Sequence, residues 1–305
     1  MNASAIAQFR RSMTSPEQLE NAVVYVTQNL SRFVKRREQV LICLPDTYGS
    51  LGWVIGQAVE RCEANPVWLG EDRRWKTLIR TAFSCHCSTI VTEPLILLGL
   101  SKLAKNMGIP LFIHNAILTG YPCMPWMRQG MEKRLDCRTY GCFDAAGVVS
   151  GFIMADEKLL RLRKDVVDAW TRDEAGEPMA DGEIGEVMLR SILEPSVEFS
   201  MEFQGCIRHT PCEEGLPEVT LSNMMVGRNV EPDIARLSGH LHRWTSILDC
   251  QVNRGPYGLE LEIVTFAGEK LPKLPTCAKQ VVRPWDPETE IPFSLLFPEN
   301  AGKNH

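Results

Sequence analysis

The chain has 305 residues, of which 44% are apolar and 23% are charged, a balance typical of globular proteins rather than disordered or fibrous ones. Its 33 basic and 38 acidic side chains give a net charge of -5, so no basic excess indicates nucleic-acid binding. The longest near-apolar run, residues 94–100, is far shorter than the ~18 residues that a membrane span needs. The N-terminus lacks the apolar core of a secretory signal, and we interpret the 11 scattered cysteines as reduced thiols of a cytoplasmic protein.

The first 140 residues alternate helical and strand patterns. Ser15, a proline and Gln18 form the pattern of a capping box, and apolar spacing predicts a helix through Val34 that the basic residues 35–37 close. Strands are predicted next at 40–44, 66–69, 89–91 and 111–114, and helices at 51–62, 73–83, 95–107 and 125–135. Short apolar strands that alternate with amphipathic helices indicate parallel βαβ units, so we expect an α/β fold with a parallel sheet flanked by helices.

The pattern then changes to antiparallel β structure. Strands are predicted at 148–154, 166–171 and 184–191 with turns between them, whereas residues 194–223 are polar and predicted to be irregular. Residues 259–266 alternate like a half-buried strand, and the prolines that follow them disfavour regular structure. We therefore expect an α/β subdomain over residues 1–145, a β-rich subdomain over 146–230, and a short strand with a Pro-rich extension over 231–305.

Two short segments carry residues suited to binding. Residues 46–52, which include Tyr48 and Gly49, leave a predicted strand and enter a helix, where glycine lets backbone amides approach an anion. The segment matches neither the P-loop nor the dinucleotide fingerprint, so an ordinary turn or a loop that lines a ligand pocket are the alternatives.

The second segment is the C-x-x-H-x-x-C run of Cys206, His209 and Cys212. Thiolate and imidazole are ligands that zinc prefers, and a loop can bring ligands three residues apart to one ion. Zinc ligands usually arrive as two pairs, however, and only one convincing pair is visible here. Coincidence in a cysteine-rich chain is therefore the alternative to a metal site.

Residues 118–147 contain an ordered set of residues whose members are Gly120, Pro122, Pro125, Trp126, Arg128, Glu132, Arg134, Leu135, Tyr140 and Gly141. This order resembles the adenylate-forming enzymes, in the phenylacetate–CoA ligase branch, where a turn after a strand precedes a P-W-x-R-x-x-[IM]-E-x-R-L helix and an adenine motif. Residues 176–178 and 181–189 resemble the family's downstream hairpin, and residues 225–228 resemble its Gly-Arg step. The resemblance covers roughly residues 15–230.

The resemblance implies the core of that fold without its usual C-terminal lid domain. It also implies AMP-forming chemistry, in which Mg·ATP and a carboxylic acid form an acyl-AMP before the acyl group passes to coenzyme A. A ligand or nucleotide site would then contain Tyr48, Gly49, Gly120, Tyr121, Tyr140, Gly141 and Asp144, the last standing where the family has a magnesium-holding glutamate.

Several parts of the family's ATP site are replaced in this sequence. No glycine precedes Gly49, although the phosphate loop of the family needs glycine before its first helix. Phe143 stands at the threonine of the adenine motif, and Tyr121 stands at the glutamate of the preceding turn. Cys212 aligns with the aspartate that grips the ribose, and a thiol is a poor acceptor for a diol. The lid domain's catalytic lysine is not recognisable either.

Three hypotheses follow from these observations. The first is a degenerate homologue that has lost ATP-dependent acyl activation and binds a partner protein or a small aromatic or acyl carboxylate. The second is an acyl- or aryl-adenylating enzyme that uses Mg·ATP, either atypical or completed by a partner subunit. The third is a zinc or thiol site at Cys206, His209 and Cys212. None of the three involves nucleic acid or a membrane.

Overall fold

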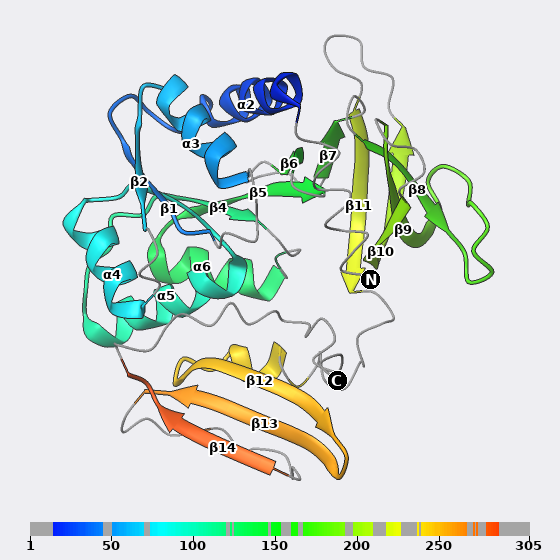
Figure 1. The fold of residues 1–305 in the computed structure, drawn as a ribbon. Helices are drawn as coiled ribbons and strands as arrows, with labels where there is room; N and C mark the ends of the chain where they lie inside the picture. The colour runs from blue at the N-terminus through cyan, green and yellow to red at the C-terminus, as the bar shows by residue number, and fades with distance from the viewer. Residues whose placement is uncertain are drawn as a thin grey trace.

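The computed structural model describes residues 15–44, 51–69, 74–119, 123, 125–145, 148–153, 160–163, 167–192, 198–209, 218–226, 237, 239–266, 271, 273 and 279–286. The described strands form one 11-stranded sheet and one 3-stranded sheet. The first part of the large sheet is flanked by helices, its second part is built from strands alone, and the small sheet lies below the helices (Figure 1).

Parallel strands form the first part of the large sheet, as the sequence predicts. They are β1 (Gln39–Ile42), β2 (Asn65–Trp68), β3 (Thr89–Thr92), β4 (Asn115–Thr119) and β5 (Arg138–Ala145). Their order is β2-β1-β3-β4-β5, and all neighbouring strands in this order pair in parallel. The chain direction across the sheet reverses between β1 and β3, which makes the carboxyl ends of these two strands the topological switch point.

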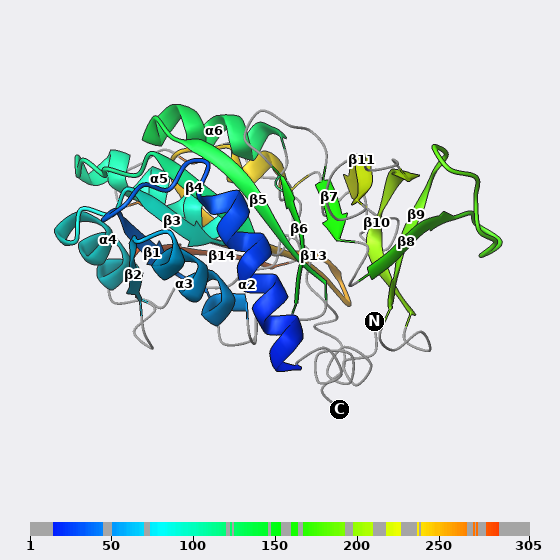
Figure 2. The ribbon, with the colours of Figure 1, turned by 90° about the horizontal axis from the view of Figure 1, so that it is seen from above.

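Helices cover both faces of these strands. They are α2 (Pro16–Leu30), α3 (Leu51–Arg61), α4 (Trp75–Ser84), α5 (Pro94–Met107) and α6 (Pro125–Leu135). Residues of β1 alternate between two cores, because Val40 and Ile42 pack with α2 and α3 whereas Leu41 and Cys43 pack with α4, α5 and α6. Viewed from above, α2 crosses the sheet next to β5 and β6 (Val148–Ile153) (Figure 2).

Two boundaries in this part differ from the prediction. Helix α2 begins with the expected capping box, in which the Gln18 amide donates to Ser15 Oγ at 3.3 Å, but it ends at Leu30 and does not reach residues 35–37. Strand β4 begins at Asn115, beyond the predicted 111–114. Residues 116–118 form the strand because this apolar run is buried between β3 and β5, whereas Phe112 remains 40% exposed.

Antiparallel strands form the second part of the large sheet. They are β6, β7 (Leu160–Arg163), β8 (Val167–Arg172), β9 (Ile184–Ser191), β10 (Glu198–His209) and β11 (Glu218–Val226). The prediction that residues 194–223 are irregular is wrong, because β10 and part of β11 lie there. Polar side chains in this region have partners on neighbouring strands. Glu198 of β10 contacts Arg190 of β9 at 3.4 Å, and Arg190 also contacts Asp168 of β8 at 2.6 Å.

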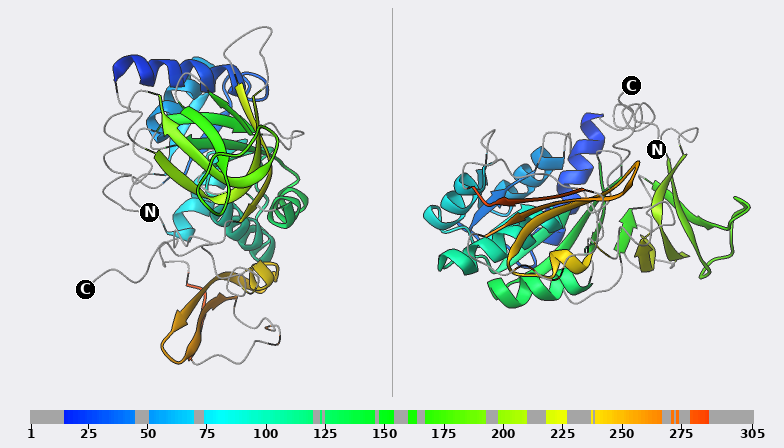
Figure 3. Two further views of the ribbon diagram at one scale, coloured as in Figure 1. Left: turned by 90° about the vertical axis from the view of Figure 1, so that its right-hand side faces the viewer. Right: turned by 90° about the horizontal axis from the view of Figure 1, so that it is seen from below.

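The small sheet consists of β12 (Ile247–Gly255), β13 (Gly258–Thr265) and β14 (Lys279–Pro284). Seen from below, it lies across the helices (Figure 3), and its Leu248 and Phe266 join the core of α5 and α6. Strand β13 was predicted, whereas β14 was not, because prolines surround it. An edge strand tolerates proline at its end, and Pro284 is the last residue of β14. Within the described residues, no helix is both long and apolar enough to cross a bilayer.

Candidate functional site

The carboxyl ends of β1, β3, β4 and β5 meet at one edge of the parallel sheet, and ligands of open α/β folds bind beyond such an edge. The predicted site residues Tyr48 and Gly49 follow β1, and Gly120 and Tyr121 follow β4. All four lie outside the described residues. The strands before them both pair with β3, so the structure fixes the sheet positions from which these two segments start.

Two buried threonines mark this edge, and the sequence analysis missed both. Thr92 ends β3 with 0% exposure and Thr119 ends β4 with 1% exposure, and neither side-chain hydroxyl has a hydrogen-bond partner among the described residues. Alternation along the strands puts Thr92 on the face of Ile90, toward α4–α6, and Thr119 on the face of Ile117, toward α2 and α3. Buried polar groups are normally satisfied, so the edge retains hydrogen-bonding capacity that the described residues do not use.

Glu93 follows Thr92 and is also buried, with 5% exposure. It is the N-cap residue of α5, whose next residue is Pro94, but its side chain makes no capping hydrogen bond. A Thr-Glu-Pro sequence directly after an apolar strand is a signal that could have identified this edge. In an α/β sequence, polar residues at strand ends indicate the ligand-binding edge of the sheet as glycine-containing loops do.

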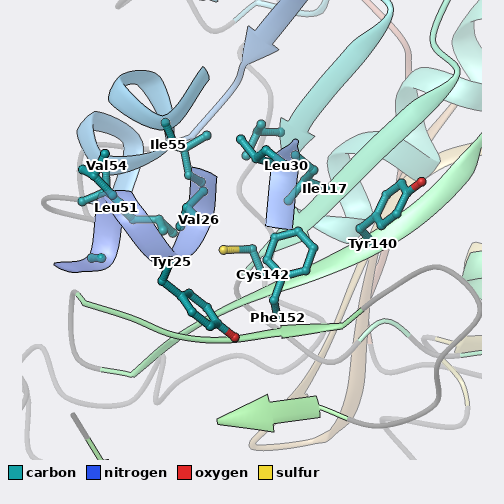
Figure 4. Close-up of a cluster of buried hydrophobic side chains, with 14 of the residues drawn as sticks. Tyr25, Val26, Leu30, Leu51, Val54, Ile55, Ile117, Tyr140, Cys142 and Phe152 are labelled. Carbon is teal, nitrogen blue, oxygen red and sulfur yellow. The ribbon is translucent and has the colours of Figure 1, made fainter. Parts of the chain in front are cut away.

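Tyr140, Gly141 and Asp144 all lie in β5. The Tyr140 side chain is 5% exposed, and its ring stacks on Phe33 with centroids 3.7 Å apart and an interplanar angle of 10°. Its hydroxyl donates to Asn115 Oδ1 at 3.4 Å. Tyr140 therefore belongs to the core beneath α2 and α3, together with Cys142, Ile117 and Phe152 (Figure 4).

Gly141 and Asp144 connect β5 to its neighbours. Gly141 is paired with Leu118 of β4 on one side and with Ile153 of β6 on the other. The backbone of Asp144 pairs with Val149, next to a register shift in the β5–β6 ladder, and its side chain lies outside the described residues. The structure thus puts both residues on the strand adjacent to β4, which leads to Gly120.

The charged residues of the resembling helix α6 fasten that helix to β5. Glu132 Oε1 accepts from the Thr139 amide at 3.1 Å, from Thr139 Oγ1 at 2.6 Å and from Arg128 Nε at 3.2 Å. Arg128 Nη2 also donates to the Thr139 carbonyl at 2.7 Å. These groups hold the strand that carries Tyr140 and Gly141 in place.

The predicted metal site falls partly on strand β10. Cys206 is buried with 4% exposure, and its thiol donates to the Gly182 carbonyl at 3.1 Å. Positions 206 and 209 belong to a regular stretch of β10, where positions three apart lie on opposite faces. The loop that this hypothesis assumed is therefore a strand over residues 206–209. The His209 side chain and Cys212 lie outside the described residues, among which no group of His, Cys, Asp or Glu could hold a metal.

Three of the described cysteines are poor nucleophiles. Burial raises the pKa of the thiols of Cys87, Cys123 and Cys137 to about 12. A reactive cysteine needs a lowered pKa, because the thiolate is the nucleophile. No disulfide joins the cysteines in the described part of the chain.

No protein-family model matches the sequence, and no curated protein matches it significantly. Solved structures do match: a 2-hydroxyisobutyryl-CoA ligase bound to R3-HIB-AMP superposes with a TM-score of 0.64 at 10% identity, over 82% of this chain and 59% of the ligase. The fold is that of acyl- and aryl-CoA ligases. A benzoate CoA ligase from Burkholderia xenovorans LB400 matches with a TM-score of 0.56 at 9% identity, over 86% of this chain and 62% of that one.

A third similar structure is the anthranilate CoA ligase AuaEII in complex with anthranoyl-AMP. Its TM-score is 0.56 at 10% identity, over 83% of this chain and 54% of the ligase. The chain thus spans only 54% to 62% of the length of these ligases. At such identities the likeness establishes the fold, and the activity has to be argued from the site.

Proposed function

We propose that this protein binds a small aromatic or acyl carboxylate, or a partner protein, on an acyl-CoA ligase scaffold and does not adenylate acids on its own. The observation that carries the proposal is the position of Tyr140. The resemblance assigns this residue to the adenine motif, yet both the stack on Phe33 and the contact with Asn115 hold it inside the core. A ring that is 5% exposed offers little surface to a nucleotide base.

The charged groups of the same motif support this view. Arg128 and Glu132 are engaged with Thr139, so neither is poised to contact a polyphosphate. The sequence before α2 contains no glycine, and Cys212 replaces the ribose-gripping aspartate in the best alignment. Adenylation depends on donors placed in advance around the developing charge, and losing one such donor costs about a hundred- to a thousand-fold in rate.

The scaffold around the sheet edge supports a binding role. The hydroxyl groups of Thr92, at the end of β3, and Thr119, at the end of β4, have no partner among the described residues. Of the predicted residues, Gly120 follows β4, whereas Tyr48 and Gly49 follow the neighbouring strand β1. A hydroxyl group at such a strand edge can donate a hydrogen bond to a carboxylate that binds beyond the edge. The branch of the family that the sequence resembles acts on an aromatic acid, which is the class we propose here.

Pyrophosphate exchange into ATP, measured with benzoate, phenylacetate and short acyl acids, tests the loss of adenylation. We expect no acid-dependent exchange by the isolated protein, together with a thermal shift in the presence of one class of acid. Acid-dependent exchange by the isolated chain would refute the proposal.

The alternative function is an adenylating subunit completed by a partner chain. It is favoured by the coverage of the ligases, since this chain spans only 59% of the first similar structure. Purification from the native host tests it, because a stable complex that catalyses exchange would contain the missing parts in a second chain. Zinc measured in the purified protein by elemental analysis would instead support the metal hypothesis at Cys206, His209 and Cys212.

A further inference from the structure

A buried lysine joins α5 to the C-terminal sheet. Lys102 lies in the third turn of α5 with 0% exposure, and its Nζ donates to the carbonyl of Ile247, the first residue of β12, at 2.6 Å. The two residues are 145 positions apart in sequence. A lysine amine is rarely fully buried, so this contact is a costly way to attach one sheet to a helix.

A buried histidine lies in the same junction. His242 belongs to the helical segment before β12 and has 2% exposure, and its Nδ1 has no hydrogen-bond partner in the part of the chain that the structure describes. The other titratable groups that face Lys102 are Cys250 and Asp249 of β12 and Arg134 of α6. We call Lys102, His242, Ile247, Asp249 and Cys250 the α5–β12 junction.

Apolar contacts hold the rest of the interface together. Leu248 and Phe266 of the small sheet are buried in the core shared by α4, α5 and α6, and the Trp285 ring lies 5.9 Å from the Phe266 ring. These contacts do not change with pH. The buried titratable groups of the junction, among them Lys102, His242 and Asp249, are therefore the groups through which protons can act on the attachment of the sheet.

The pKa values of both Lys102 and His242 lie below their ordinary values. The pKa of Lys102 is lowered to about 7, chiefly by burial; Cys250 and Asp249 oppose this shift, and the nearby Arg134 contributes to it. Burial and the charge of Lys102 lower the pKa of His242 to about 3, against the effect of a hydrogen bond with the Cys250 backbone. Because the charge of Lys102 disfavours a charge on His242, two cations inside this interface are disfavoured.

We propose that the α5–β12 junction is a proton-sensitive latch, which keeps the C-terminal sheet on α5 and α6 at neutral pH and releases it on acidification. Opening the junction exposes both bases to water and restores their ordinary proton affinity. Acid therefore favours the open form, because only that form binds a proton on His242 between pH 6.5 and 3. The open form is populated more, by up to tenfold for each pH unit lost in this window.

Lys102 acts in a different pH range but in the same direction. Between pH 7 and its ordinary pKa of 10.5, only the open form carries the extra proton. The population of the closed form therefore increases relative to that of the open form as pH rises through this range. Below pH 7 the lysine is charged in both forms, and the further pH dependence comes from His242.

Hydrogen exchange read by mass spectrometry on the full chain tests the latch. Protection of β12, β13 and β14, corrected for the intrinsic pH dependence of exchange, should fall by up to tenfold per pH unit between pH 6.5 and 4.5. Protection of β1, β3 and β4 should not fall with it. A sheet whose protection is independent of pH, or whose loss is shared by the whole chain, would refute the proposal.

Matched variants separate the latch from general instability. His242→Gln should flatten the acid dependence, whereas His240→Gln should leave it intact, because His240 is exposed on the same helical segment beside Trp244. Lys102→Met should remove the increase in protection between pH 7 and 9, with Lys105→Met as the exposed control on α5. An unchanged acid slope in the His242 variant, or an unchanged rise in the Lys102 variant, would contradict the proposal.

Discussion

At the scale of single residues, Glu132 shows that a residue of the resembling motif can have a structural role. One carboxylate oxygen accepts hydrogen bonds from Arg128 and from two groups of Thr139, which links α6 to β5. The sequence resemblance placed Glu132 correctly in a helix but could not show whether the residue faces a ligand or its own strand. That distinction depends on the partner across the helix–strand interface, which no local pattern encodes.

We expect Glu132→Gln to lower the free energy of unfolding by about 1–3 kcal/mol, because hydrogen bonds to a charged acceptor are replaced by weaker ones. Urea denaturation measures this change. Glu60→Gln is the control, since Glu60 is an exposed helical glutamate whose recorded contact is with Gln57, and its effect should stay within ~0.5 kcal/mol. Equal effects of the two substitutions would show that the links to Thr139 add nothing.

Tyr140 gives a prediction of the same kind. Tyr140→Ala removes a buried ring that stacks on Phe33 and should lower the free energy of unfolding by about 3–5 kcal/mol, as large aromatic truncations do. Tyr140→Phe keeps the stack and loses the hydroxyl with its contact to Asn115, so it should cost about 0.5–1.5 kcal/mol. Thermal unfolding with and without Mg·ATP measures both; an ATP-induced shift that disappears in the phenylalanine variant would instead assign the hydroxyl to nucleotide binding.

At the scale of elements, the packing of α4 on α5 depends on a glycine. A Cβ at Gly99 of α5 would overlap the ring of Trp75, which is 3% exposed and cannot move aside. We expect Gly99→Ala to destabilise the protein by about 1–3 kcal/mol through overpacking, despite the higher helix propensity of alanine. Urea denaturation provides the measurement.

Gly56→Ala is the matched control for Gly99→Ala. A Cβ at Gly56 of α3 would also overlap a tryptophan ring, but that ring belongs to Trp68, which is 52% exposed and can swing into solvent. This substitution should therefore be close to neutral. A larger loss of stability at Gly56 than at Gly99 would contradict the argument from burial.

The elements also show which parts of the fold a single sequence can predict. Signals contained in one segment worked: the capping box predicted the start of α2, and the helical patterns over residues 95–107 and 125–135 predicted α5 and α6. Elements that need a distant partner failed, because β10, β11 and β14 are polar or proline-flanked and become strands only through their neighbours. The end of α2 failed for a related reason, since the chain must turn at residues 31–34 to reach β1.

At the scale of the whole molecule, the layers explain where a ligand can bind. Helices α2 and α3, the large sheet, helices α4–α6 and the small sheet follow one another, so both faces of the parallel strands and the outer side of α5 are covered. At the carboxyl edge of the parallel strands, the hydroxyl groups of Thr92 and Thr119 end in the core with no hydrogen-bond partner among the described residues. The sequence predicted this edge through the glycines after β1 and β4, and it missed Thr92, Glu93 and Thr119, because burial of a polar residue is visible only in the assembled layers.

Thr119→Val tests whether this edge is a binding site. The valine has the same shape without the unpaired hydroxyl, so the ligand-free protein should gain about 1 kcal/mol in free energy of unfolding. If the hydroxyl serves a ligand, the same variant should lose most of the thermal shift that benzoate or phenylacetate produces in the wild type.

Ser88→Ala is the control for Thr119→Val, because the Ser88 hydroxyl is also buried and unpaired but lies next to the amino end of β3, at the opposite edge of the sheet. Ser88→Ala should leave intact the thermal shift that benzoate or phenylacetate produces. Stabilisation by both substitutions with an unchanged thermal shift would mean that the Thr119 hydroxyl is only a packing imperfection. A binding site at this edge requires that Thr119→Val alone both raises the free energy of unfolding and loses the ligand-induced thermal shift. The reason is that a buried polar group that serves a ligand destabilises the ligand-free protein.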